Sequence, residues 1–294
     1  MSHAQHLDIR IGTLVSMDRA ESVIPQIIGH GFESFQLTCW QKLPTEDVSE
    51  LAKRILGLVE GRAVISALGL YGNPMTDELC LSEWPRIVKL CAAFGCDTVC
   101  GFTGALEDRP VDQNLDRFVE VWGELTRMAE AEGVKIGFEN CDMGGSWESP
   151  RFNIAHSPRA WEMLFNAVNS DSLGLEWEPC HQMVSFVDPI ANLREWVGKV
   201  VHIHGKDATV HHDLVRKYGT RSGMYVVHHR TPGFGDTNWS DIITLLRMNG
   251  FCGAIDIEGW HDPVYREDLE MTGQVHALNY LKTCRGGAYV ENPK

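Results

Sequence analysis

The sequence predicts a single α/β domain, a (β/α)8 barrel (TIM barrel) that spans residues 1–294. Short apolar runs recur along the chain, and each is followed by a polar turn and a longer stretch with helical periodicity. Eight such pairs are present, which is the repeat of a parallel sheet with covering helices. No Gly/Ser/Pro-rich linker divides the chain. Because barrels of about 250 residues commonly form one domain, we expect one domain.

The predicted strands and helices alternate from the first apolar run to the last. The strands are expected at Ile9–Val15, Ser34–Trp40, Ala63–Tyr71, Asp97–Gly104, Lys135–Cys141, Leu173–His181, Val200–Asp207 and Gly253–Trp260. The helices are expected at 19–30, 45–60, 77–94, 113–132, 158–168, 188–199, 238–249 and 264–282. Three helices carry N-terminal signals at Asp112, Ser157-Pro158 and Asp188-Pro189. An open doubly wound sheet is disfavoured because neither GxGxxG nor GxxxxGK[ST] follows a strand.

Composition and charge limit the kinds of partner. Hydrophobic residues make up 44% of the chain and charged residues 22%, as in an ordinary folded protein. Acidic residues outnumber basic ones by 40 to 26, which gives a net charge of −14. Such a surface repels phosphate backbones and anionic membranes on average. We therefore expect neither a nucleic-acid nor a membrane partner.

Cysteine usage and the N-terminus indicate a cytoplasmic protein. The nine cysteines have irregular spacings and form no CxxC pair, which is typical of reduced thiols. The first residues, MSHAQHLDIRIG, lack the apolar core of a signal peptide. No apolar run approaches the roughly 18 residues that a membrane span requires. We expect a soluble cytoplasmic protein that forms a homo-oligomer, a dimer or a tetramer.

Metal-ligating residue types stand at the carboxyl ends of four of the later predicted strands. They are Glu139, Glu178 with His181, His204, and Glu258. A carboxylate in an apolar strand is costly to bury unless it is protonated, paired or bound to a metal. Because parallel strands end together at one barrel mouth, these groups are expected to share one ion. Each glutamate alone could instead form an ion pair or cap a helix.

Three carboxylates and one imidazole are a hard, oxygen-rich ligand set. Such a set suits one divalent ion, with Mn²⁺ favoured and Mg²⁺ or Co²⁺ also acceptable, and it leaves positions for substrate oxygens. A structural zinc site would favour cysteine. The candidate metal ligands are Glu139, Glu178, His204 and Glu258.

The motifs around these residues resemble those of the xylose-isomerase-like sugar phosphate isomerase/epimerase family. The resemblance covers nearly the whole chain and rests on Glu139-Asn140, Glu178-Pro-Cys-His181, His204-Gly-Lys206-Asp207, Pro232-Gly-Phe-Gly-Asp236 and Glu258. The family usually has Asp where this chain has Glu178. The extra methylene means that either the turn or the ion shifts by about one C–C bond length.

The resemblance implies roles for individual residues. Glu139, Glu178, His204 and Glu258 would bind the ion, and His181 would hydrogen-bond a substrate oxygen. Glu139 and Glu258 would be the catalytic acid/base pair. Moving a proton between faces of a sugar carbon, or between adjacent carbons, needs a base on one side and an acid on the other. A metal at the neighbouring carbonyl would stabilise the resulting enediolate.

Other residues are candidates for binding the substrate. Arg230 could hold a substrate hydroxyl or phosphate, or it could pair with Asp236 or Asp207. Lys206 either supports the placement of His204 or contacts the substrate. The strand-end aromatic residue Trp177 could stack on a sugar or pack in the core, and the same choice applies to Trp40, Tyr71 and Trp260.

The longest irregular segment is expected at Ala208–Asp236, after the seventh strand. A loop of this length in a compact domain is usually functional, and in a barrel it would lie over the active-site face. It contains the pairs His211-His212 and His228-His229. We expect these histidines to be solvated and do not assign them as ligands.

The sequence therefore predicts a metal-dependent isomerase or epimerase of a small sugar. A lyase or dehydratase acting on a keto-polyol, such as an inosose or a 3-keto-sugar, begins with the same proton abstraction and stays open. An endonuclease IV-like zinc phosphodiesterase is a remote alternative, because the predicted second and third strands offer no histidine ligands and the charge is wrong for DNA. A non-catalytic sugar-binding barrel would not need both Glu139 and Glu258.

Overall fold

Eight parallel strands form a closed barrel in the computed structural model, which describes residues 6–293. The order around the barrel is β1-β10-β7-β6-β5-β4-β3-β2. The strands are β1 (Ile9–Ser16), β2 (Ser34–Trp40), β3 (Val64–Tyr71), β4 (Thr98–Gly101), β5 (Lys135–Glu139), β6 (Leu173–Trp177), β7 (Val200–Gly205) and β10 (Gly253–Ile257). The predicted (β/α)8 fold is confirmed.

Each of the eight predicted helices has a counterpart. They are α1 (Ala20–Ile27), α2 (Val48–Val59), α3 (Glu78–Phe94), α4 (Leu115–Glu132), α5 (Pro158–Ala167), α7 (Pro189–Trp196), α9 (Trp239–Met248) and α10 (Glu270–Cys284). Two further helices, α6 (Pro179–Val184) and α8 (His212–Tyr218), were not predicted. No helix in the described part of the chain is long and apolar enough to cross a membrane.

Local signals explain several helix ends. The Asp188 side chain accepts the backbone N–H groups of Ile190 and Ala191 and caps α7, as predicted. Ser157 occupies the N-cap of α5, with Pro158 at its first turn. The prediction for Asp112 is wrong: this residue lies in a 3₁₀ turn that precedes α4 and delays the start of the helix to Leu115.

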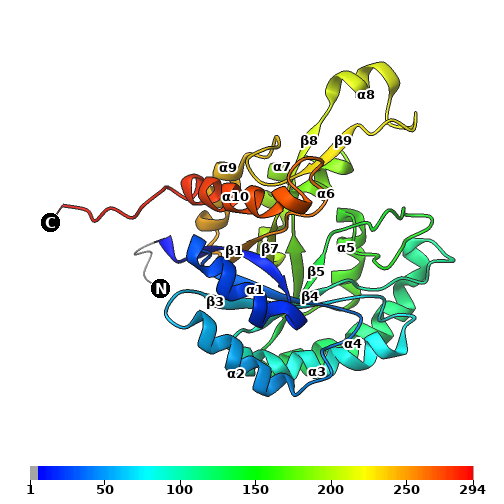
Figure 1. The fold of residues 1–294 in the computed structure, drawn as a ribbon. Coiled ribbons are helices and arrows are strands. Elements are labelled where there is room, and N and C mark those ends of the chain that lie inside the picture. Colours follow the sequence, from blue (N-terminus) through cyan, green and yellow to red (C-terminus); the bar gives the residue numbers. More distant parts are fainter. Residues whose placement is uncertain (1–5, 294) are drawn as a thin grey trace. The chain divides into compact units, whose positions relative to one another are not determined.

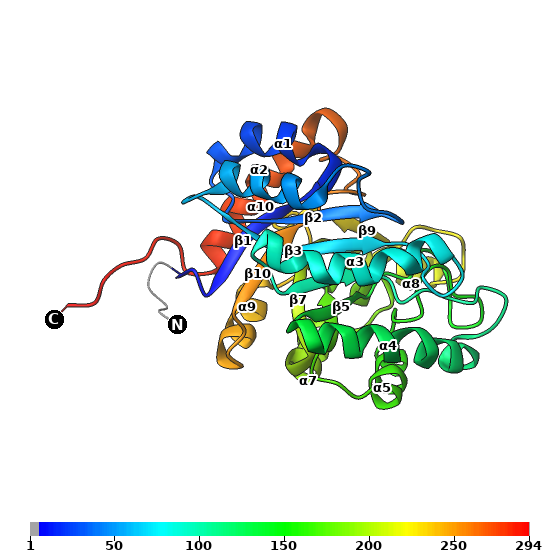
Figure 2. The same ribbon diagram turned by 90° about the horizontal axis from the view of Figure 1, so that it is seen from below.

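The described chain forms two compact units. The first unit comprises the described parts of Met1–Thr13, Glu178–Gly198 and His204–Lys294, and the second comprises Leu14–Trp177 and Lys199–Ile203. In the second unit, α3 and α4 run along the outer side of the sheet from β3 to β5 (Figure 1 and Figure 2). Trp122 joins these layers, because its ring lies 4.7 Å from that of Trp84 on α3 and 4.6 Å from that of Phe138 on β5.

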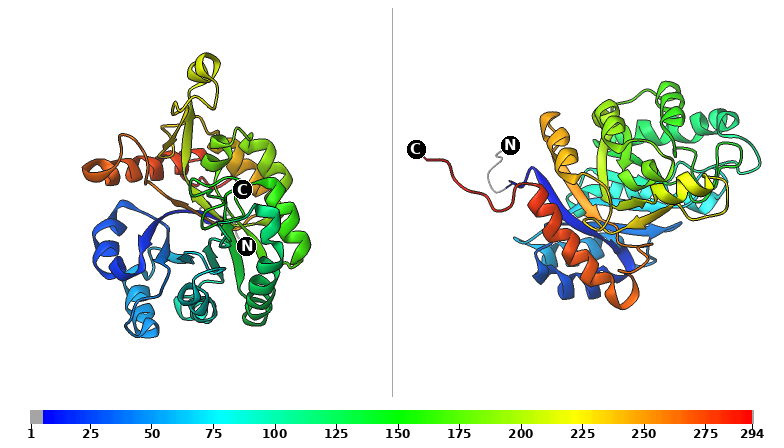
Figure 3. Two further views of the ribbon diagram at one scale, coloured as in Figure 1. Left: turned by 90° about the vertical axis from the view of Figure 1, so that its right-hand side faces the viewer. Right: turned by 90° about the horizontal axis from the view of Figure 1, so that it is seen from above.

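In the first unit, β1 pairs with β10 from Ile9↔Gly253 to Thr13↔Ile257. A separate antiparallel hairpin joins β8 (Asp207–Val210) to β9 (Val227–Arg230). Helix α8 lies between these strands in the sequence, at the outer end of the hairpin (Figure 3, left). We call residues 207–230, which comprise β8, α8 and β9, the hairpin arm.

Two predicted segments differ from the structure. The strand expected at Leu173–His181 ends at Trp177, because Pro179 cannot donate a sheet hydrogen bond and instead begins α6. The irregular loop expected at Ala208–Asp236 is largely ordered as the hairpin arm. Its strands were missed because their pairing joins two short segments across an intervening helix.

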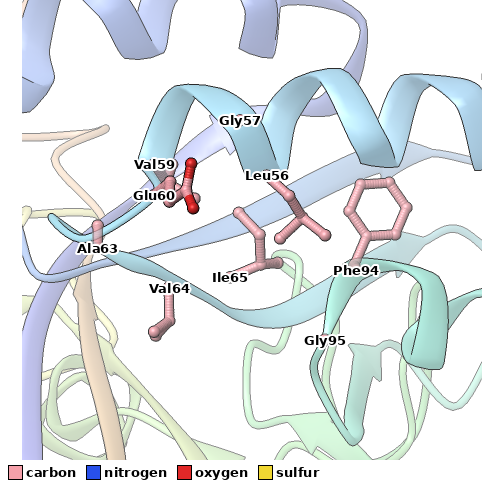
Figure 4. A pocket seen from close by; sticks show the side chains of 9 residues that line it. All are labelled: Leu56, Gly57, Val59, Glu60, Ala63, Val64, Ile65, Phe94 and Gly95. Carbon is pink, nitrogen blue, oxygen red and sulfur yellow. The ribbon is translucent and has the colours of Figure 1, made fainter.

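An apolar pocket of about 460 Å³ lies in the second unit, between the end of α2, the start of β3 and the end of α3 (Figure 4). Leu56, Val59, Ile65 and Phe94 contribute apolar side chains to its lining. The pocket is at the amino end of β3, whereas active sites of such barrels form at the carboxyl ends. It is therefore not the candidate active site.

Candidate functional site

Three of the predicted metal ligands meet in the first unit. Glu178 directly follows β6, His204 is the fifth residue of β7, and Glu258 directly follows β10. One side-chain oxygen or nitrogen from each residue lies within 4.8 Å of those of the other two. The side chains are almost fully buried, with exposed fractions of 0%, 1% and 6%. Two carboxylates and an imidazole thus share one buried cluster.

The backbone around these residues fixes their positions. The Glu258 N–H donates to the Gly205 carbonyl over 3.1 Å and holds the end of β10 against the end of β7. A Cβ atom at position 205 would lie 3.2 Å from Ile257 Cα, so glycine permits this close approach. Pro179 starts α6 and leaves Glu178 at its N-cap.

Lys206 supplies a buried positive charge to this cluster. Its Nζ atom donates to Glu258 Oε1 over 2.8 Å and lies 3.9 Å from Glu178 Oε2. Burial by itself raises the pKa of Glu258, but the charge of Lys206 and the hydrogen bond from His204 outweigh it, so the pKa is lowered. Both carboxylates are therefore expected to be ionised at neutral pH.

His181 lies beside Glu178, with 2.8 Å between His181 Nε2 and Glu178 Oε1. Burial raises the pKa of Glu178, but the charges of His181 and Lys206 together hold it well below its ordinary value. The structure thus brings His181 and Lys206 together with three of the predicted ligands.

His229 is a site residue that the sequence reasoning missed. Its half-buried ring lies 5.0 Å from the ring of His181 and 5.8 Å from that of His261. Burial, followed by the charges of Lys206 and His181, lowers the pKa of His229 to about 3, so the ring is neutral at physiological pH. The ring is thus only partly exposed to solvent. The signal that could have identified it is strand alternation, which places His229 on the same face as the buried Val227.

Arg230 forms an ion pair with Asp262, with 3.1 Å between Nε and Oδ2. Asp262 also accepts the N–H of Thr231 over 2.9 Å, so it fixes the end of β9. The partners considered from the sequence, Asp236 and Asp207, are not those observed. Asp207 instead accepts the backbone N–H groups of Gly233 and Thr237. Gly233 lies within the Pro232–Asp236 motif, and Thr237 directly follows it.

The fourth predicted ligand, Glu139, belongs to the second unit, where it ends β5 and is 5% exposed. Its carbonyl oxygen accepts a hydrogen bond from Asn153 Nδ2 over 2.7 Å. Glu139 pairs in register with Glu176 on β6, two residues before Glu178. Its strand-end position is therefore the one expected from the sequence.

Glu176 is a second residue that the sequence reasoning missed. It is fully buried, and Gln36 Nε2 donates to its Oε1 over 2.6 Å. The Tyr71 hydroxyl donates to Oε2 over 2.8 Å, and His202 Nδ1 lies 3.1 Å from Oε1. One carboxylate thus connects residues of β2, β3 and β7 to β6. The alternation of Glu176 and Glu178 in LEWEP was the available signal.

The aromatic candidates have different environments. Trp177 is fully buried, so its indole offers no surface to a substrate in this structure. Tyr71 is 8% exposed, and burial together with the charges of Glu176 and Glu139 raises its pKa well above the ordinary value. Trp40 and Trp260 are each 51% exposed.

The cluster in the first unit fits a divalent cation. Two buried carboxylates, Glu178 and Glu258, face one buried ammonium group, that of Lys206. Buried ionised carboxylates are costly unless positive charges or a bound cation compensate them. Carboxylate oxygens and an imidazole nitrogen are ligands for hard and borderline divalent ions.

Comparison with known sequences places these residues in a family context. A profile described as a xylose isomerase-like TIM barrel matches residues 26–284. The uncharacterized protein YfiH of Bacillus subtilis is 23% identical over 241 residues, covering 77% of this chain and 66% of YfiH. An inosose dehydratase of Clostridium perfringens is 24% identical over 178 residues, covering 58% of this chain and 55% of the dehydratase. The chain thus spans just under two-thirds of the first relative and about half of the second.

Solved structures share the fold at low identity. L-ribulose 3-epimerase superposes with a TM-score of 0.68 at 16% identity, covering 94% of this chain and 96% of that one. The 3-keto-D-glucoside 4-epimerase YcjR of E. coli has a TM-score of 0.66 at 14% identity, covering 94% and 100%. The IOLI protein with a zinc atom has a TM-score of 0.66 at 16% identity, covering 94% and 96%.

Proposed function

Because this chain belongs to the xylose isomerase-like TIM barrel family, we propose that it is a divalent-metal-dependent isomerase or epimerase of a small sugar or keto-polyol. The observation that carries the proposal is the buried cluster of Glu178, His204 and Glu258 with Lys206. The names of the epimerases that share its fold, and of the zinc-containing IOLI protein, are consistent with it.

The proposed metal ligands are Glu139, Glu178, His204 and Glu258, with Mn²⁺ as the favoured ion. Glu139 is included because it ends β5, and the carboxyl ends of parallel barrel strands lie at one face. A bound divalent cation would stabilise negative charge that develops on a substrate carbonyl oxygen. His181 and Arg230 are proposed to bind substrate oxygens.

Glu139 and Glu258 are the proposed acid/base pair. One carboxylate removes the proton from the carbon next to the carbonyl, and the other carboxyl group returns a proton on the opposite face or at the neighbouring carbon. Lys206 donates to Glu258 Oε1, so it orients this carboxylate and favours the ionised form that a base requires. Lys206 is proposed to position the Glu258 carboxylate and also to contact the substrate.

A dehydratase acting on a keto-polyol is the second candidate function. It is favoured by the inosose dehydratases among the sequence relatives, which are 20–25% identical over part of their length. The first step is the same proton abstraction, and a hydroxyl group on the next carbon then leaves as water.

The two functions are distinguished by incubating the Mn²⁺-loaded protein with a panel of ketoses and inososes in D₂O. Deuterium at one carbon of an intact carbon skeleton identifies an isomerase or epimerase. Loss of water identifies a dehydratase. If no member of the panel incorporates deuterium or loses water, both functions are rejected for these substrate classes.

The first prediction concerns the metal itself. In crystals grown with Mn²⁺, we expect one ion bound by Glu139, Glu178, His204 and Glu258, with carboxylate–metal distances of about 2.1–2.3 Å. Anomalous scattering at the manganese edge locates the ion. An ordered ion elsewhere, with Glu178 turned away, contradicts the ligand set.

The hairpin arm is proposed to cover the site, because its strand β9 places His229 beside His181. The second prediction is that trypsin cuts the native protein first within the arm, where Arg216, Lys217 and Arg221 are exposed. The cut protein should lose turnover of the substrate identified in D₂O, since a cover excludes water from a reactive intermediate. Unchanged turnover after complete cleavage of the arm would show that it is not a cover.

A further inference from the structure

Four residues of the second unit form a row at the carboxyl ends of consecutive strands. Trp40 on β2 pairs with Tyr71 on β3. Gly69 pairs with Cys100, so Tyr71 and Phe102, each two residues further along, lie side by side. Gly101 pairs with Phe138, so Phe102 and Glu139, each one residue further along, also lie side by side. The rings of Tyr71 and Phe102 lie 5.2 Å apart, as this register requires. We call Trp40, Tyr71, Phe102 and Glu139 the strand-end row.

The far end of the row is aromatic, and Trp40 at this end is exposed to solvent. The ring of Trp40 lies 5.7 Å from that of Phe152 and 6.4 Å from that of Phe102. Trp40 is 51% exposed and Phe152 is half-buried, whereas Phe102 beneath them is buried. We call Trp40, Phe102 and Phe152 the aromatic platform.

The platform is held in place by the backbone around Glu139. The backbone φ of Phe152 is +57°, a left-handed conformation that residues other than glycine rarely adopt. Asn153 follows it, and its Nδ2 atom donates to the carbonyls of both Glu139 and Cys141 over 2.7 Å. The Thr103 hydroxyl donates to Asn153 Oδ1 over 2.7 Å. One buried amide therefore fixes Phe152 relative to Glu139.

The length of the row sets the size of a ligand that would touch both ends. Trp40 and Glu139 are separated by three strand spacings, about 14 Å along the sheet. A single pyranose ring held at Glu139 is shorter than this distance. A second ring joined to it through a glycosidic bond reaches the platform, where an aromatic side chain can cover its flat apolar face.

We infer that the substrate is a glycoside, whose sugar ring reacts at Glu139 and whose second ring stacks on Trp40 and Phe152. This inference rests on the proposed function and names its substrate class. The chemistry recognised at the platform is a flat ring face, which either a second sugar or an aromatic aglycone presents.

The test measures binding of unreactive glycosides to the full-length, Mn²⁺-loaded protein by calorimetry. Three matched pairs are used, the phenyl and methyl β-glycosides of glucose, galactose and xylose, with cellobiose as the two-sugar probe. In at least one pair, the phenyl glycoside should bind roughly threefold to tenfold more tightly than the methyl glycoside. Cellobiose binding as tightly as the preferred phenyl glycoside identifies a sugar as the second ring, and weaker binding identifies an aryl aglycone.

Variants assign the preference to the platform. Trp40→Ala should remove it, and Trp40→Phe, which keeps a flat ring, should retain most of it. Met248→Ala is the control, since it removes a side chain that is 77% exposed at the end of α9, next to the amino end of β10. Equal binding of phenyl and methyl glycosides in every pair, absence of binding in every pair, or an unchanged preference in Trp40→Ala overturns the inference.

The outcomes also separate this inference from the proposed function. A ring preference that depends on Trp40, in a protein that exchanges no deuterium with the panel, supports glycoside binding at the platform and rejects the reaction for free ketoses and inososes. Deuterium exchange with free ketoses, combined with no ring preference, supports the reaction and rejects the glycoside.

Discussion

In Glu139→Gln and Glu258→Gln, we expect turnover of the substrate identified in D₂O to fall by roughly two to four orders of magnitude, the contribution of a positioned general base or acid. Glutamine keeps the size and shape of the side chain but cannot accept the proton. At position 258 it also loses the charge that Lys206 contacts over 2.8 Å. Steady-state rates, with deuterium incorporation as an independent readout, check the expectation.

Metal content must be measured in the same preparations, because both residues are proposed ligands and part of the loss can come from a weaker site. Rates are therefore compared at saturating Mn²⁺. Glu124→Gln, an exposed substitution on α4, is the control and should leave turnover unchanged. If either site variant keeps its metal and more than about a tenth of its activity, a loss far below that of a general base, the two-carboxylate mechanism is wrong.

The second large effect is expected on stability, at Glu176. Glu176→Leu removes a fully buried carboxylate that contacts Gln36, Tyr71 and His202, and it leaves their polar groups without this acceptor. Removing one partner from a buried charged network costs about 3–5 kcal/mol. The free energy of unfolding, measured by urea denaturation with circular dichroism, checks this value.

Glu124→Leu is the matched control, because it makes the same chemical change at an exposed position of the same unit. Surface changes of this kind usually alter stability by less than about 0.5 kcal/mol. An equal effect of the two substitutions would mean that the contacts of Glu176 do not contribute to stability.

The sequence predicted all eight barrel strands because an apolar run followed by an amphipathic helix is a local pattern. It failed where a single residue overrides such a pattern. Pro179 ended the sixth strand four residues early and started a helix at the site. The hairpin arm was missed because its pairing, such as Asp207↔Arg230, joins two short segments across an intervening helix.

The candidate site shows the same division between local and non-local information. Glu178, His204 and Glu258 were predicted to meet because their strand-end positions are visible in the sequence, and in the first unit they do meet. The Arg230–Asp262 pair was not predicted, because Asp262 lies in a connection after β10 whose path the sequence does not specify. Glu176 was missed for a different reason: its alternation with Glu178 marks one face of the strand but does not indicate three buried partners on other strands.

The pairing of β1 with β10 has a consequence for the order in which the nascent chain folds. Ile9 pairs with Gly253, so the first strand has no partner on this side until more than 240 further residues have been made. At about 5–20 residues per second, the wait is roughly 12–50 s. Residues 14–177, which form most of the second unit, are complete well before then. Barrel closure is thus a late step in folding, and until it occurs this edge of β1 is unpaired and can associate with other chains.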